Sequence, residues 1–180
     1  LGQVQTAWEA AHFEGAARSS LNLLFRSAVE TGKRARSETT ISRGTASISH
    51  AAVEMATDVV GELAGKRVVV VGAGSMGEGV AVALHKAGGS EILVVNRSPE
   101  RGASLATRVN GRTVGMDQLA VAVASADVIV ASTGSSEPII TADLVRNARL
   151  DGRADQPLHI FDIAMPRDVE VGVADLAGVT

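Results

Sequence analysis

The stretch V-V-V-V-G-A-G-S-M-G, residues 68–77, constrains the fold of this chain more than any other feature. Four consecutive valines are typical of a strand that is buried on both faces, as in parallel sheets. Three glycines follow with the spacing G-x-G-x-x-G, and a helical pattern begins at Ser75. A glycine-rich turn between a strand and a helix is a common way to bind the phosphates of a nucleotide. The alternative is a strand–helix turn without a ligand.

After this turn, short apolar runs alternate with helical patterns. Aromatic residues make up only 2% of the chain, so its core has to consist of Val, Ile, Leu and Ala. Strand–helix alternation favours βαβ units with right-handed crossovers. The predicted fold class is α/β, a doubly wound Rossmann-type parallel sheet. The predicted strands are 68–71, 92–95, 113–114, 128–130 and 158–161, and the predicted helices are 75–87, 99–109, 116–124 and 141–149.

The residues before the first strand form an all-helical N-terminal segment in this prediction. Apolar residues at helical spacing predict helices over 3–13, around 21–29 and from 48 to 63, with Gly65 ending the third. The polar segment Gly32–Gly44 shows no such spacing and is interpreted as the domain junction. Ser47 and Ser49 are expected to cap the third helix.

Composition narrows the possible functions. The net charge is −3, so no large basic field indicates nucleic-acid binding. There is no cysteine, which excludes disulfides, zinc–thiolate sites and a cysteine nucleophile within these residues. The four histidines are dispersed without metal-ligand spacing, so no metal site is predicted. The sequence contains no apolar run of about 20 residues, and a cytoplasmic location without membrane contact is expected.

Each glycine of the turn has a predicted task in binding a dinucleotide. Gly72 allows the tight turn, Gly74 lets the backbone approach a pyrophosphate, and Gly77 lets the helix pack closely on the strand. The backbone N–H groups at the helix start would face the phosphates. The predicted contacts of this turn therefore also include Ala73, Ser75 and Met76.

The end of the second strand, V-V-N-R-S, indicates which dinucleotide is bound. In NAD-binding domains an acidic residue about 20 residues after the glycines binds the ribose 2′-OH. Asn96 occupies that place here, followed by Arg97 and Ser98. These side chains suit a 2′-phosphate, which a carboxylate would repel, so NADP(H) is predicted over NAD(H). The alternatives are a solvated Arg97 and a Ser98 that only caps the helix beginning at Pro99.

Later strand ends supply further candidates. Ligands of doubly wound sheets lie beyond the carboxyl ends of the strands. Thr133 and Gly134 are therefore predicted to line the cofactor, the alternative being an ordinary polar turn. The apolar loop containing Met165 is a predicted surface for a nicotinamide. Asp162 and Asp168 are possible acid–base groups, although such residues more often stabilise turns and caps.

Several unusual motifs, taken in order along the whole chain, resemble bacterial glutamyl-tRNA reductases. The chain differs from the family at two positions within these motifs, with Ser75 where the family often has Glu and Met165 where it often has Val. Neither difference affects the glycines. The motifs are L-G-Q-V at 1–4, L-F-R-S-A at 24–28, G-K-R-A-R-S-E-T at 32–39, S-I-S-H-A-A-V-E at 47–54, the glycine turn, V-N-R-S, and D-I-A-M-P-R-D-V-E at 162–170.

The resemblance implies an enzyme that reduces glutamyl-tRNA to glutamate-1-semialdehyde with NADPH, the first step of tetrapyrrole (5-aminolevulinate) biosynthesis. The reaction passes through a cysteine thioester, and that cysteine is expected upstream of Leu1. No catalytic residue is therefore assigned here, and the 180 residues alone are expected to be inactive. Residues 1–43 would be the helical remnant of an upstream catalytic domain, and 44–180 the NADP(H)-binding Rossmann domain.

The resemblance also assigns a substrate residue and partners. Gln3 matches a family glutamine of the substrate pocket, the alternative being an exposed residue at a helix end. The expected partners are glutamyl-tRNA as the substrate, a second copy bound through a C-terminal domain, and the aminomutase that receives the aldehyde. Two other functions stay open: the NADPH domain of an enzyme similar to shikimate dehydrogenase, and a non-enzymatic NADP-binding module.

Overall fold

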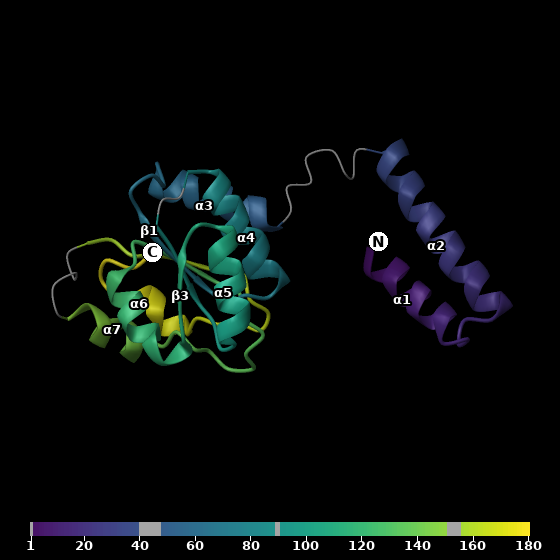
Figure 1. The fold of residues 1–180 in the computed structure, drawn as a ribbon. Coiled ribbons are helices and arrows are strands. Elements are labelled where there is room, and N and C mark those ends of the chain that lie inside the picture. Colours follow the sequence, from purple (N-terminus) through teal and green to yellow (C-terminus); the bar gives the residue numbers. More distant parts are fainter. Residues whose placement is uncertain (1, 40–47, 89–90, 151–155) are drawn as a thin grey trace. The chain divides into compact units, whose positions relative to one another are not determined.

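The computed structural model describes residues 2–39, 48–88, 91–150 and 156–180, which divide into two compact units, Leu1–Thr45 and Ala46–Thr180 (Figure 1). The predicted helix cap at Ser47 lies outside the described residues. In the described part of the chain, no helix is both long enough and apolar enough to cross a membrane.

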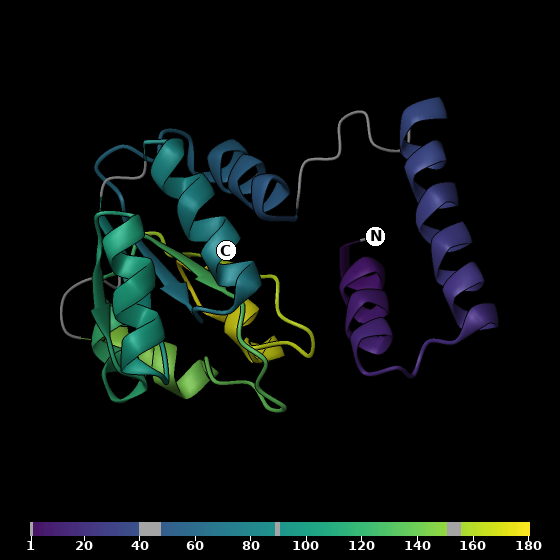
Figure 2. The same ribbon diagram turned by 45° about the vertical axis from the view of Figure 1, so that its right-hand side comes forward.

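The first unit consists of two helices that lie side by side, α1 (Gly2–Phe13) and α2 (Ser19–Glu38) (Figures 1 and 2). The Trp8 indole N–H donates to Asn22 Oδ1 at 2.8 Å, and the Asn22 amide in turn donates to the Ala17 carbonyl at 2.9 Å. Gly15 lies in the connecting turn with φ +68°, which favours glycine. The two helices are thus joined by a polar contact next to a glycine turn.

The predicted junction at Gly32–Gly44 was wrong in its first part, because α2 continues through Gly32 to Glu38. The residues Lys33–Glu38 are mostly good helix formers, so they need no apolar periodicity to stay helical. Arg34 and Glu38 also form an ion pair one turn apart, with Nε and Oε1 3.0 Å from each other. The rest of the predicted junction, residues 40–44, lies outside the described residues.

The second unit begins with α3 (Ile48–Val60), which ends earlier than the predicted stop at Gly65. Gly61 has φ +78°, a backbone conformation that stops a helix and suits glycine. Ala52 is buried as predicted, but Val53 and Ala56 are buried where Met55 and Val59 were expected, and these two are exposed. Ser49 is no cap, because it lies buried within the helix. The helix therefore packs through small residues.

The sheet confirms the doubly wound prediction. Five strands lie in the order β3-β2-β1-β4-β5, and every neighbouring pair is parallel. The strand order reverses between β1 and β4, and Val71 at the end of β1 is paired with both Val95 and Ala131. The strands are β1 (Arg67–Val71), β2 (Glu91–Val95), β3 (Arg112–Val114), β4 (Val128–Ala131) and β5 (His159–Asp162).

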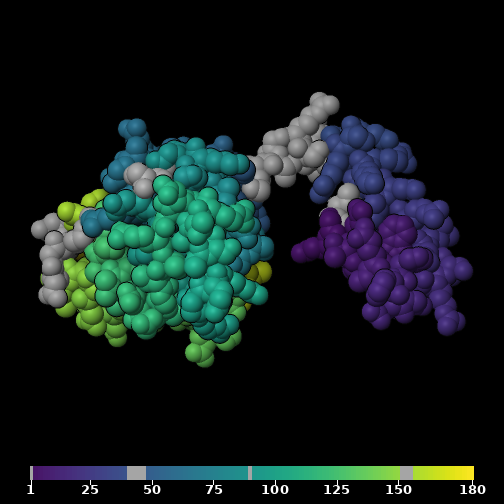
Figure 3. Space-filling model, in the orientation of Figure 1, coloured from purple at the N-terminus to yellow at the C-terminus, as the bar shows by residue number. Residues whose placement is uncertain are grey.

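Helices cover both faces of the sheet, which gives three layers. Val68 and Val70 of β1 belong to one buried cluster with α3, α4 and α5, whereas Val69 and Val71 belong to a second cluster with α6 and α7. Helices α4 and α5 contact each other on the first of these faces. Figure 3 shows the molecule in a space-filling view from the same side as Figure 1. The remaining helices are α4 (Ser75–Lys86), α5 (Pro99–Arg108), η2 (Met116–Gln118), α6 (Leu119–Ser125), α7 (Ala142–Arg149) and η3 (Val171–Asp175).

This arrangement brings the carboxyl ends of the strands to one edge of the sheet. The turns after β1, β2, β4 and β5 meet there, and α4 and α5 begin there. Ligands of doubly wound sheets bind at this edge, next to the point where the strand order reverses.

Candidate nucleotide-binding site

The glycine turn after β1 owes its shape to two of its three glycines. Gly72 has φ +102°, and a Cβ there would lie 2.9 Å from the Ser132 carbonyl oxygen. A Cβ on Gly77 would collide with the Gly72 carbonyl oxygen and with Ser132 Oγ. Gly74, by contrast, faces open space, because a Cβ there would meet no other atom within 4 Å. The turn therefore leaves an open approach at Gly74, as a ligand would require.

The start of α4 offers donors to a ligand. Its N-cap is Gly74, which has no side chain to accept a hydrogen bond from these N–H groups. The first N–H groups of a helix have no partner within the helix, and they carry a partial positive charge. An anion placed beside Gly74 and Ser75 would receive these hydrogen bonds.

Asn96 has a role that the sequence did not predict. Its side-chain oxygen accepts the Ala73 N–H at 3.0 Å, and its side-chain amide donates to the Ser98 carbonyl at 2.9 Å. The residue therefore ties the glycine turn to the end of β2. Because the Ala73 N–H is already used, the N–H groups left for a phosphate are those at the start of α4.

Two arginines face the same hollow from the end of β2 and the start of α5. Arg97 and Arg101 both line it, and neither side chain forms an ion pair or hydrogen bond with any residue that the structure describes. Arg101 was missed by the sequence analysis, although it follows Arg97 at a spacing of four, in the first turn of the predicted helix.

Ser98 caps α5, as one of the two interpretations of this residue expects. Its hydroxyl oxygen accepts the Arg101 N–H at 3.4 Å, and its hydroxyl donates to Glu100 Oε2 at 2.9 Å. The hydrogen bonds from the backbone N–H of Glu100 itself and from the Ser98 hydroxyl hold the pKa of Glu100 below its ordinary value. The exposed Glu100 is thus a negative charge in the first turn of α5, where it precedes Arg101 in the chain.

The turn after β4 is held by a buried carboxylate. Asp168 is fully buried, and its Oδ2 accepts the Thr133 N–H at 2.6 Å while its Oδ1 accepts the Thr133 hydroxyl. Asp162 accepts the backbone N–H groups of Ala164 at 3.0 Å and Val169 at 3.1 Å. Both carboxylates stabilise loops, so the turn interpretation describes them better than an acid–base role.

These elements enclose a hollow of about 500 Å³ at the carboxyl edge of the sheet. It brings together eight of the predicted residues, from the glycine turn, the end of β2 and the turn after β4. Its size is in the range of ligand pockets. The lining residues that were predicted are Gly72, Ala73, Gly74, Asn96, Arg97, Ser98, Thr133 and Gly134, and those that were missed are Arg101, Met116, Ser132, Ser135 and Ile139.

The structure places the other predicted residues elsewhere. Ser75 lines an adjoining hollow that also contains Arg101. Gly77 and Met76 follow on α4, where Gly77 is buried against the turn. Met165 is 93% exposed and does not line the hollow. Gln3 is exposed on α1, in the first unit.

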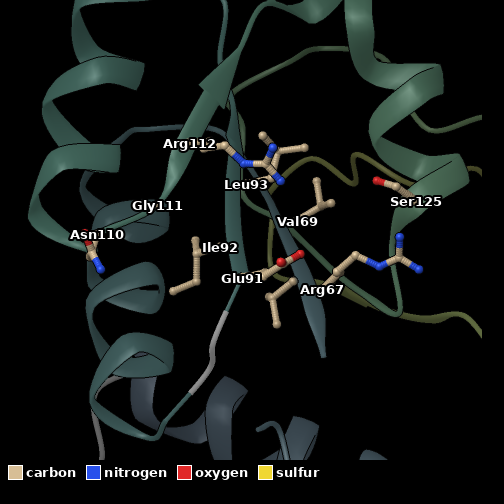
Figure 4. Close-up of a pocket in the computed structure, with 10 residues that line it drawn as sticks. Arg67, Val69, Glu91, Ile92, Leu93, Asn110, Gly111, Arg112 and Ser125 are labelled. Atoms are coloured by element: carbon tan, nitrogen blue, oxygen red, sulfur yellow. The ribbon is translucent and has the colours of Figure 1, made fainter. Parts of the chain in front are cut away.

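A second hollow, of about 250 Å³, lies at the opposite edge of the same sheet (Figure 4). It is lined by Arg67, Glu91 and Arg112 at the amino ends of β1, β2 and β3. Arg67 is partly neutralised, because its Nε lies 3.9 Å from Asp127 Oδ2. The sequence predicted no site at this edge.

The fold and the glycine turn agree with a comparison against protein families. Residues 54–180 match the family described as shikimate / quinate 5-dehydrogenase. The chain belongs to this family. The match begins within α3 and includes the whole sheet, so it covers every residue that lines the hollow at the carboxyl edge.

Over its full length the chain is similar to glutamyl-tRNA reductases, which confirms the resemblance found in the sequence. It is 43% identical to the enzyme of Kineococcus radiotolerans, covering 99% of this chain and 40% of that protein, and 39% identical to that of Bacillus subtilis, covering 99% and 39%. The solved glutamyl-tRNA reductase of Methanopyrus kandleri is 44% identical with a TM-score of 0.68, covering 98% of this chain and 44% of that one. The chain therefore spans about two fifths of the length of the curated relatives it matches.

Proposed function

We propose that the hollow at the carboxyl edge binds NADPH, with the adenosine 2′-phosphate between Arg97 and Arg101. The observation that carries this proposal is the pair of guanidinium groups without a protein partner among the described side chains, at the strand end where NAD-binding domains carry a carboxylate. Guanidinium groups bind phosphates with paired, charge-assisted hydrogen bonds. A cofactor without the 2′-phosphate would leave both charges unused.

The pyrophosphate of the cofactor is assigned to the glycine turn. Gly74 offers an open approach to the backbone, and the free N–H groups at the start of α4 point to the same place. Gly72 and Gly77 give the turn its shape, with Asn96 holding it to the end of β2. Thr133 and Gly134 would line the nicotinamide half of the molecule, across the point where the strand order reverses.

We propose further that the full protein reduces glutamyl-tRNA to glutamate-1-semialdehyde. The similarity to glutamyl-tRNA reductases supports this, because it includes residues 1–53, which precede the match to the dehydrogenase family. When bound, NADPH would supply the hydride for the reduction, and the residues of this chain would bind and orient it. These residues contain no cysteine, so a thioester-forming nucleophile would have to come from another part of the protein.

The two units have different proposed roles in that reaction. Residues 1–43 would belong to the catalytic domain, with the exposed Gln3 available to the substrate, and residues 44–180 would be the NADP(H)-binding domain. A second candidate, the NADPH domain of an enzyme similar to shikimate dehydrogenase, is favoured by the family match alone. It does not account for the similarity of the helices α1 and α2 to the reductases.

The test measures NADPH oxidation by the full-length protein with glutamyl-tRNA as the substrate. The 180-residue chain is measured alongside, and shikimate with NADP⁺ serves as the competing reaction. Turnover of glutamyl-tRNA by the long form, with only NADPH binding by the short form, is the expected result. A long form that binds NADPH and oxidises shikimate instead would establish the second candidate.

A further inference from the structure

The turn after β4 is fixed by a chain of hydrogen bonds that begins at a buried charge. Asp168 is fully buried, and both of its side-chain oxygens accept hydrogen bonds from a single residue, Thr133. The Thr133 hydroxyl oxygen in turn accepts the Ser135 N–H at 3.1 Å. One carboxylate therefore sets the backbone direction of Thr133, its side-chain rotamer and the position of Ser135.

The same aspartate joins this turn to the neighbouring loop. The backbone carbonyl of Asp168 accepts the N–H groups of Ile139 at 2.8 Å and Ile140 at 2.9 Å. The segment after β4 is thus tied at two places to the segment after β5. A carboxylate taken out of water is costly unless it is hydrogen-bonded, so this arrangement is strongly specified.

We propose that Asp168 is a positioning residue for the nicotinamide half of the cofactor, acting through Thr133. Thr133 lines the hollow, whereas Asp168 does not. The dinucleotide of a doubly wound domain crosses the sheet where the strand order reverses, with its adenosine ribose at the end of β2. The β4 turn then meets the other half of the molecule, away from Arg97 and Arg101. This inference rests on the proposed NADPH site.

The proposal predicts different effects on the affinities for two ligands, whereas a general loss of folding would weaken the binding of both. Adenosine 2′,5′-bisphosphate carries the part of the cofactor assigned to the end of β2, and it lacks the nicotinamide half. A disturbed β4 turn weakens NADPH binding and leaves the bisphosphate unaffected. A destabilised domain weakens both.

The experiment titrates NADPH and adenosine 2′,5′-bisphosphate into the full-length protein and its variants, with thermal melting measured for each. Thr133→Val removes the hydroxyl at nearly constant volume, Asp168→Ala removes the carboxylate, and the double variant combines them. Ser136→Ala is the matched control, because the exposed Ser136 hydroxyl lies in the same segment and does not line the hollow.

Thr133→Val and Asp168→Ala are each expected to weaken NADPH binding about tenfold, because either change releases the β4 turn from the position in which it meets the cofactor, and binding must then order it again. Binding of the bisphosphate is expected to stay within about twofold, and the double variant should bind NADPH no worse than Asp168→Ala, because the two residues act as one unit. Thr133→Ser keeps the hydroxyl and is expected to restore NADPH binding. Ser136→Ala should behave as the unchanged protein.

Two results would overturn the inference, and a third would refute the NADPH site on which it rests. If Thr133→Val loses affinity for NADPH and the bisphosphate equally, the contact between Thr133 and Asp168 only stabilises the fold. If Thr133→Val binds NADPH as the unchanged protein does, the contact does not position the cofactor. If Asp168→Ala does not fold, Thr133→Val and Thr133→Ser decide the question alone. An unchanged protein that binds neither ligand would instead refute the NADPH site itself.

Discussion

The two edges of the sheet differ in what surrounds their arginines. Both edges carry a hollow lined by two arginines, Arg97 and Arg101 at the carboxyl edge and Arg67 and Arg112 at the amino edge. At the carboxyl edge the arginines stand beside the turn 72–77 and the N-terminus of α4. At the amino edge Arg67 faces Asp127, and Glu91 lines the same hollow. The comparison teaches that the two pairs of arginines differ in the backbone donors beside them, and this difference is why we assign the cofactor to the carboxyl edge.

The largest expected effect comes from reversing the charge of Arg97. Arg97→Asp should weaken NADPH binding about 100-fold, because it removes charge-assisted hydrogen bonds and places a negative charge near the 2′-phosphate. NADH binding should change far less. Arg112→Asp makes the same change at the amino edge and should leave both affinities unaltered. Calorimetric titration measures the affinity of each of the two variants for each of the two cofactors. Equal losses of NADPH and NADH affinity in Arg97→Asp would refute the 2′-phosphate assignment.

The glycines at the two edges give a second contrast. Gly72→Ala should lower the free energy of unfolding by about 2 kcal/mol, because φ is +102° and a Cβ would press on the Ser132 carbonyl. Gly111→Ala should also destabilise the domain, since a Cβ there would collide with the Ile92 carbonyl oxygen. Only Gly72→Ala should also weaken NADPH binding by the folded protein.

Gly74→Ala completes this contrast. A Cβ at Gly74 would meet no protein atom and φ is −78°, so the free energy of unfolding should fall by less than about 1 kcal/mol, the cost of placing Ala at an N-cap. NADPH binding should still weaken, because the methyl group would occupy the approach to the pyrophosphate. Urea unfolding and NADPH titration of the three variants measure both quantities. A Gly74→Ala protein with unchanged NADPH affinity would place the pyrophosphate elsewhere.

Substitution of Asn96 tests how far the glycine turn depends on the hydrogen bond that holds it to the end of β2. Asn96→Ala should weaken NADPH binding about tenfold, because it releases the Ala73 N–H and one hydrogen bond to Ser98. Asn110→Ala is the matched change at the amino edge, where no effect on NADPH is expected. Titrations with NADPH and NADH should show similar losses for Asn96→Ala. A loss confined to NADPH would instead make Asn96 a direct ligand of the 2′-phosphate.

The smallest effect is expected at Glu100. Glu100→Gln should strengthen NADPH binding about twofold at neutral pH, because it removes an exposed negative charge from the first turn of α5, which also carries Arg101. The pKa of Glu100 is lowered, so its charge and its bond to Ser98 persist above the ordinary carboxyl pKa and are lost as pH falls through the lowered value. The NADPH affinities of Glu100→Gln and the unchanged protein should therefore become equal as the pH falls into the acid range. A ratio of these two affinities that does not vary with pH would contradict this role.

Much of the fold followed from local sequence signals, and the failures have physical causes. The alternation after Arg67 predicted all five strands, and β1, β2 and β4 were the clearest because buried parallel strands are largely apolar runs. The end of α2 was missed, since a solvated helix of Lys, Arg, Ala and Glu has no apolar period to detect. The buried face of α3 was misplaced, because small residues such as Ser49 and Ala56 pack there, and apolar spacing does not detect them.

The sequence predicted those residues of the candidate site that belong to contiguous motifs. The glycine turn and the N-R-S end of β2 are contiguous motifs, and together with the turn after β4 they supplied eight of the lining residues. The link between Thr133 and Asp168 joins residues 35 positions apart, which no local pattern reports. Met165 was predicted from the apolar character of its loop, and only the folded chain shows it 93% exposed and away from the hollow.

The most direct test of the central claim is a crystal structure of the protein with NADP⁺ bound. The account predicts the 2′-phosphate between Arg97 and Arg101, and the pyrophosphate against Gly74 and the first turn of α4. A 2′-phosphate bound at the amino edge, between Arg67 and Arg112, or a pyrophosphate away from the start of α4, would contradict it.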